Sequence, residues 1–190
     1  MSLHVVSPPA HTVRAAVRYL GRMKAGSGFL TRGALAASTG KALFLSAPHP
    51  VFNLGVADLG TPEALARTRM TGWRFIVLSQ GTAVATLEFA ASDRRDQGCF
   101  ARVTDGRMAA SSSRAIGRAE MHPLVKARRY ALGMVRVTAL DACALWLRDL
   151  AESDRHDLFA MVGAVSGPMT AERWISQIDL MQSLQNVRMS

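Results

Sequence analysis

The amino-acid sequence predicts an α+β fold in which about three to four helices pack against a largely antiparallel sheet of about six to eight strands. Three observations lead to this prediction. Runs rich in β-branched and aromatic residues recur along the chain, segments with apolar residues at helical spacing separate them, and tight turn signals join several of the runs. A helix, several strands, a helix, more strands and a terminal helix is the order expected of this class.

Length and composition favour one domain that spans residues 1–190. The chain has 190 residues, of which 49% are hydrophobic and 19% are charged. This composition is typical of a globular interior and unlike that of a disordered chain. The sequence contains no internal repeat.

The first predicted helix covers residues 11–24. Val13 and Val17 recur with Ala16 and Leu20 at helical spacing, while arginines follow at i, i+4 and i+8 on another face. After a glycine-punctuated stretch, two short strands are expected on either side of Pro48-His49-Pro50. Thr61-Pro62-Glu63 then predicts a helix start, because threonine caps helices and proline suits their first position, and this helix should end near Met70.

Residues 72–104 predict an antiparallel meander. GWRFIVLS and TAVATLEFAAS are two strand-like runs joined by a Gln80-Gly81 turn, and CFARVT follows as a third run after the polar loop 92–98. Successive strands of a meander pair with their neighbours.

The second half of the chain predicts a small-residue helix over 108–121, then strands near 130–140 and 158–165. Residues 143–150 (CALWLRDL) fit a strand or a helix equally well on periodicity. Pro168 and Thr170 predict the start of a last helix, with Trp174, Ile178 and Met181 on one apolar stripe.

Charge is concentrated at the N-terminus. The net charge is +9, and because the first acidic residue is Asp58, the first 57 residues carry +6 of it. A basic segment of this kind attracts phosphates or acidic proteins, although arginine also serves as an ordinary solubilising residue. Two isolated cysteines and no apolar run of spanning length predict a cytoplasmic protein without a membrane segment.

No catalytic template fits the chain, so the sequence leaves enzymatic activity open and leans against it. Gly26-Ser27-Gly28 begins like a dinucleotide fingerprint, but the third glycine is out of place. The five histidines have no short metal-ligand spacing, and no cofactor is expected. Asp154, His156 and Asp157 crowd one predicted turn, where local hydrogen bonds are favoured over proton transfer.

Two basic runs define the nucleic-acid-binding alternative. They would contact phosphates, with an affinity that falls with salt. Their members are Arg14, Arg18, Arg22, Lys126, Arg128 and Arg129.

Several short segments carry a resemblance. Pro50 to Gly55, Gly72-Trp73-Arg74, Ala83 to Ala85 and Ala144 to Arg148 resemble the corresponding segments of a family of uncharacterised bacterial proteins, commonest in actinobacteria. The similarity covers roughly residues 48–150. It implies no activity, because none is established for that family.

Arginines that recur inside apolar strands provide the ligand hypothesis. If Arg74, Arg136 and Arg148 share one sheet face, they can line an anion-binding groove; if carboxylates such as Glu88 and Asp149 pair with them, they cannot. We therefore expect a non-enzymatic module that binds a small anionic ligand or a protein partner, and a homodimer is compatible with that role. Nucleic-acid binding and an enzyme with a site drawn from distant segments are the alternatives.

Overall fold

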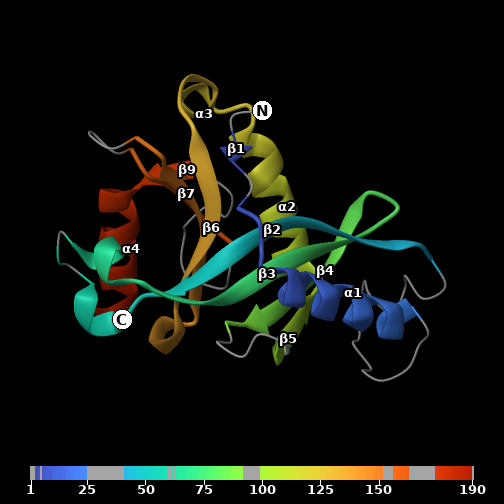
Figure 1. Cartoon of the computed structure of the whole chain (residues 1–190). Coiled ribbons are helices and arrows are strands. Elements are labelled where there is room, and N and C mark those ends of the chain that lie inside the picture. Colours follow the sequence, from blue (N-terminus) through green and yellow to red (C-terminus); the bar gives the residue numbers. More distant parts are fainter. Residues whose placement is uncertain are drawn as a thin grey trace. The chain divides into compact units, whose positions relative to one another are not determined.

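A computed structural model describes residues 3–4, 6–24, 41–59, 61, 63–91, 99–151, 156–162 and 174–189 (Figure 1). It contains four helices and nine strands, and the strand pairings are mostly antiparallel, as the α+β prediction requires. The chain forms two compact units. The first unit comprises residues 1–5, 51–70 and 114–190, and the second comprises residues 6–50 and 71–113. The single domain expected from length stays a prediction, and each unit is considered by itself.

The second unit is built on the predicted meander. Strands β3 (Arg69–Ser79), β4 (Thr82–Ala90) and β5 (Cys99–Asp105) pair antiparallel in that order, with β2 (Leu43–Asn53) next to β3. Gln80 and Gly81 form the β3–β4 turn with φ of 50° and 78°. Positive φ at both central residues matches the strand twist, which explains the tight hairpin.

One face of this meander packs on helix α1 (Ala10–Lys24). Trp73, Phe75 and Phe89 join Tyr19 and Leu20 of α1 in a buried cluster. Because side chains alternate along a strand, the residues between those aromatic positions point to the opposite face.

The first unit contains the other group of paired strands. Strands β6 (Tyr130–Val137), β7 (Ala142–Asp149), β8 (Leu158–Met161) and β9 (Trp174–Ser176) pair antiparallel in sequence order. The end of β2 and the short strand β1 (Leu3–His4) pair parallel with β6. The remaining helices are α2 (Arg107–Ala119), which has residues in both units, α3 (Pro123–Ala127) and α4 (Gln177–Met189).

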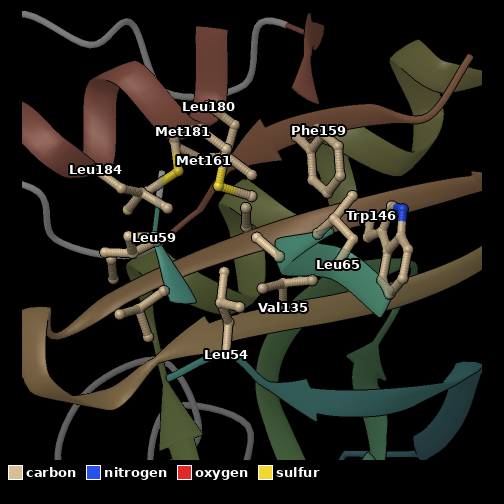
Figure 2. Packing of buried hydrophobic residues seen from close by; sticks show 14 residues of the cluster. Leu54, Leu59, Leu65, Val135, Trp146, Phe159, Met161, Leu180, Met181 and Leu184 are labelled. Atoms are coloured by element: carbon tan, nitrogen blue, oxygen red, sulfur yellow. The ribbon is translucent and has the colours of Figure 1, made fainter. Parts of the chain in front are cut away.

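Figure 2 shows the core of the first unit, where Leu180 and Met181 of α4 lie beside Met161 of β8. Trp146 of β7 and Phe159 of β8 extend the same cluster, with ring centroids 6.0 Å apart. This cluster is entirely apolar, so it offers no recognition chemistry for a charged ligand.

Three sequence predictions are corrected. Residues 61–70 do not form a helix: the described part contains only a 3₁₀ turn at Ala64–Arg67, and β3 begins at Arg69. The two strands expected around Pro48 and Pro50 are one strand, β2. Trp174 lies in β9, outside the last helix, and the Ile178 side chain on α4 is 77% exposed.

The remaining predicted segments either fall in a described element or lie outside the described residues. Residues 143–150, undecided between strand and helix, fall in β7 apart from the last residue. The loop 92–98, Gly26 to Gly28 and the proposed helix start at Pro168 lie outside the described residues. None of the described helices is long and apolar enough to cross a membrane.

Candidate functional site

A row of polar side chains crosses the second unit on the sheet face opposite α1. Arg74 of β3 is directly opposite Glu88 of β4, and Glu88 is directly opposite Arg102 of β5. The Arg74 Nε lies 3.8 Å from Glu88 Oε1, and the Arg102 Nε lies 3.3 Å from Glu88 Oε2. Each carboxylate oxygen therefore faces one guanidinium.

His49 of β2 lies close enough to Arg74 for the charge of Arg74 to act on it. Its imidazole is fully buried, and its Nδ1 lies 2.6 Å from the carbonyl oxygen of Ala47. A carbonyl oxygen only accepts hydrogen bonds, so Nδ1 carries the hydrogen and Nε2 presents a lone pair. Nε2 is buried and has no hydrogen-bond partner among the described residues.

Burial and charge both keep His49 neutral. Burial, which is the larger cause, and the positive charge of Arg74 together lower the pKa of His49 to about 3, while the bond to Ala47 opposes the shift. Ala47 adopts a φ of 46°, which is rare for a residue with a Cβ and strains the strand. The strand therefore holds the imidazole in one orientation at some local cost.

We name His49, Arg74, Glu88 and Arg102 the charged row. It runs from the interior to solvent: Arg74 is completely buried, Glu88 is 5% exposed, and the Arg102 side chain is 48% exposed. Two guanidiniums, one carboxylate and a neutral imidazole give the charged row a net charge of +1. The charges of the buried Arg74 and Glu88 cancel, so the excess positive charge belongs to the half-exposed Arg102 at the solvent end.

The unit that contains the charged row is strongly basic. Its sequence holds eleven Lys and Arg residues against four Asp and Glu residues, so it carries most of the +9 net charge. Asp93 and Asp96 lie outside the described residues, as does the side chain of Asp105, which leaves Glu88 as the acidic side chain that the structure places in this unit.

The chemistry of the charged row suits an anion that also carries a hydroxyl group. Guanidinium groups bind carboxylate or phosphate oxygens, and the Nε2 lone pair can accept a hydrogen bond from an O–H group. A metal ion fits poorly, because the positive charge of Arg74 acts on the His49 imidazole and would repel a cation bound there. Among the described residues, no group of three His, Cys, Asp or Glu side chains is placed to hold a metal.

The three arginines of the ligand hypothesis do not come together on one face. In the β6–β7 register, Arg136 is opposite Cys143, whereas Arg148 is opposite Ala131. Because residues an odd number of positions apart on β7 point to different faces, Arg136 and Arg148 point away from each other. The expectation of a shared groove is therefore wrong for this pair, and Arg148 instead lies 5.9 Å from the centroid of the Trp146 ring.

The nucleic-acid alternative divides between the two units. Arg14, Arg18 and Arg22 are exposed on α1 in the second unit. Lys126 and Arg129 are exposed in the first unit, where Arg128 forms an ion pair with Asp149 at 2.8 Å. Nucleic-acid binding by these residues stays a prediction.

Asp149 anchors a hydrogen-bonded network between β7 and β8. Its buried carboxylate accepts bonds from Arg128 at 2.8 Å, from the Ala151 amide at 3.0 Å and from the His156 amide at 3.1 Å. Asp157 accepts bonds from the Asp149 amide and the Trp146 indole. These bonds satisfy both carboxylates, so the network stabilises the connection and leaves little acceptor capacity for a ligand.

A small apolar pocket of about 10 Å³ lies in the first unit. Its lining is Val135, Val137, Ala142, Cys143, Ala144, Met161, Leu180 and Leu184. It holds no charged group, and the charged row is the better site for an anion.

The sequence named Arg74 and Glu88 but missed His49 and Arg102. Pro48 and Pro50 obscured His49, because they indicated a break in the strand. A period-two reading of β4 and β5, with Glu88 on the polar side, is the signal that could have identified Arg102.

Comparison with protein-family models, curated proteins and solved structures finds no match. The resemblance to the uncharacterised bacterial family stays a prediction.

Proposed function

We propose that the protein is a non-enzymatic binding module and that the charged row binds a small hydroxylated anion. Hydrogen phosphate and short 2-hydroxycarboxylates are the ligand class. The observation that supports the proposal is the fully buried His49 Nε2: it is an acceptor without a partner among the described residues, on an imidazole that the charge of the buried Arg74 acts on. The anionic oxygens would lie toward the guanidiniums, and the hydroxyl would donate to Nε2.

In this proposal the ligand enters the charged row from solvent at Arg102. Its half-exposed side chain marks the solvent end of the charged row, and one carboxylate serves two guanidiniums there. A monoanion such as lactate would bring the net charge of the charged row to zero, and a partly desolvated site strengthens this attraction relative to water.

A cytoplasmic location is part of the same proposal. Both cysteines, Cys99 and Cys143, are free thiols, as is common in a reducing compartment.

Titration calorimetry at pH 7 tests the ligand class with two matched pairs. Phosphate should bind more tightly than sulfate, and lactate more tightly than propionate, by about tenfold each, because only the first member of each pair has an O–H donor. His49→Asn keeps a donor for the Ala47 carbonyl but removes the Nε2 lone pair, so it should abolish this preference.

Arg102→Gln should weaken phosphate and lactate binding by about tenfold or more, since it removes a charge-assisted contact. Arg107→Gln is the matched control, because it removes an exposed arginine of the same unit outside the charged row. Equal affinities within each pair, or equal phosphate affinity for the two arginine variants, would refute the proposal.

A further inference from the structure

The outward face of α1 carries two parallel rows of side chains. Val13, Val17 and Gly21 repeat at i, i+4 and i+8, and Arg14, Arg18 and Arg22 repeat one position later. All six positions are exposed, with Val13 37% and Val17 56% exposed. We name these six residues the α1 face.

The sequence around the α1 face contains no acidic residue. Arg14 and Arg18 form no ion pair with any described residue, and the segment from residue 1 to 57 has no Asp or Glu. The rise of a helix separates successive arginines by about 6 Å along the axis. They therefore present a regular line of positive charge.

Among the described residues, the apolar row lies outside the core cluster that α1 packs into. The buried side of α1 consists of Ala15, Ala16, Tyr19 and Leu20, so Val13 and Val17 are not needed for that packing. A Cβ added at Gly21 would meet no atom of the described residues within 4 Å, so steric space does not explain the glycine there. Glycine in a helix is unfavourable, but it allows another backbone to approach closely.

We propose that the α1 face is a docking surface for an acidic amphipathic helix of a partner protein. Charge complementarity selects this occupant: carboxylates at i, i+4 and i+8 on a partner helix would match the arginine spacing, and an adjacent apolar row would cover Val13 and Val17. Docking of two copies through this face is disfavoured, because the arginines would repel one another. A phosphate backbone would engage the arginines and leave the valines without a partner.

Fluorescence anisotropy with the full chain tests this surface. The probe is a labelled 18-residue helical peptide with Glu and Leu rows at i, i+4 and i+8, compared with a scrambled peptide of the same composition and with a 20-base-pair DNA duplex. The patterned peptide should bind about tenfold or more tightly than the scrambled one, because pattern and not charge alone gives the fit.

Variants separate the two rows. Arg14→Glu/Arg18→Glu should weaken binding of the patterned peptide by about tenfold or more, and Val17→Ser by about fivefold. Arg69→Glu/Arg188→Glu is the control: it makes the same change in net charge at two exposed arginines of the other unit, and binding should stay within about twofold. Circular dichroism checks that each variant is folded. If Arg14→Glu/Arg18→Glu is not folded, Arg14→Gln/Arg18→Gln is used in its place.

Two outcomes would overturn the proposal. Equal binding of the patterned and scrambled peptides, or no effect of Val17→Ser, would show that the apolar row takes no part. Tighter binding of the duplex, lost in the arginine variant and unchanged in Val17→Ser, would assign the α1 face to nucleic acid. Neither outcome bears on the charged row, whose test uses different residues and different ligands.

Discussion

Acid should destabilise the protein through His49, and the size of the effect follows from its burial. The unfolded imidazole has a pKa near 6.5, whereas burial and Arg74 lower the folded pKa to about 3. Between these values the unfolded state binds more protons than the folded state. The free energy of unfolding therefore falls as pH decreases below about 6.5, and this loss continues down to about pH 3.

The loss between pH 7 and pH 5 is about 2 kcal/mol, since each pH unit below the unfolded pKa contributes about 1.4 kcal/mol. Urea unfolding of the wild type and His49→Asn at several pH values measures it. The variant should start less stable at pH 7, and its difference from the wild type should shrink by about 2 kcal/mol by pH 5. His11→Asn is the control, because His11 is only partly buried at the start of α1. A constant difference between wild type and His49→Asn across this range would refute the reasoning.

Two further predictions concern positions outside the charged row. Burial raises the pKa of Asp149, but the bonds from Ala151, Arg128 and His156 outweigh it and hold the pKa below its usual value. Asp149→Asn should therefore cost about 2 kcal/mol at pH 7, with the cost fading as pH falls through the folded pKa, while Asp141→Asn in an exposed left-handed position should be nearly neutral by urea unfolding. Gly72→Ala should cost at least about 2 kcal/mol because its Cβ would clash with the Phe89 carbonyl, whereas Gly21→Ala should raise stability by about 1 kcal/mol; thermal unfolding would contradict this pair if both changes had the same sign.

The fold class and the meander were predictable because their signals are local. The Gln80-Gly81 turn requires positive φ, and the flanking runs have the β-branched and aromatic composition of strands. The residues of β7 gave no such signal, because nearly all of them are buried. Their sequence therefore shows neither the alternation of a half-buried strand nor the apolar stripe of a helix. Its pairing with β6 and β8 decides the strand.

The prediction of two strands around Pro48 and Pro50 was wrong for a physical reason. Pro48 and Pro50 lack N–H groups, which argues against a paired strand. Because they lie two residues apart, both missing donors fall on the same edge of the strand, and the extended φ of proline suits the strand itself. A break was therefore expected where a single strand carries His49 into the interior.

The candidate site depends on register, which the sequence does not reveal. Arg74 is followed and preceded by apolar residues, and its partner Glu88 is fourteen positions away across the hairpin. A one-residue shift would turn Glu88 toward α1 and separate the pair. The same argument explains why Arg136 and Arg148 were grouped wrongly, since their faces are fixed by pairing and not by composition.

A double substitution tests whether the ionic pair serves stability or binding. Arg74→Met alone should cost about 3–5 kcal/mol, because it leaves Glu88 buried beside only one arginine. Arg74→Met/Glu88→Leu replaces both charges by apolar groups, and buried ion pairs replaced in this way are often as stable as before. We expect the double variant to recover most of the lost stability in urea unfolding and to bind phosphate at least about tenfold more weakly than the wild type, since only Arg102 remains. If the double variant is as unstable as the single variant, the charged row stabilises the fold; if it keeps wild-type phosphate affinity, the ligand binds elsewhere.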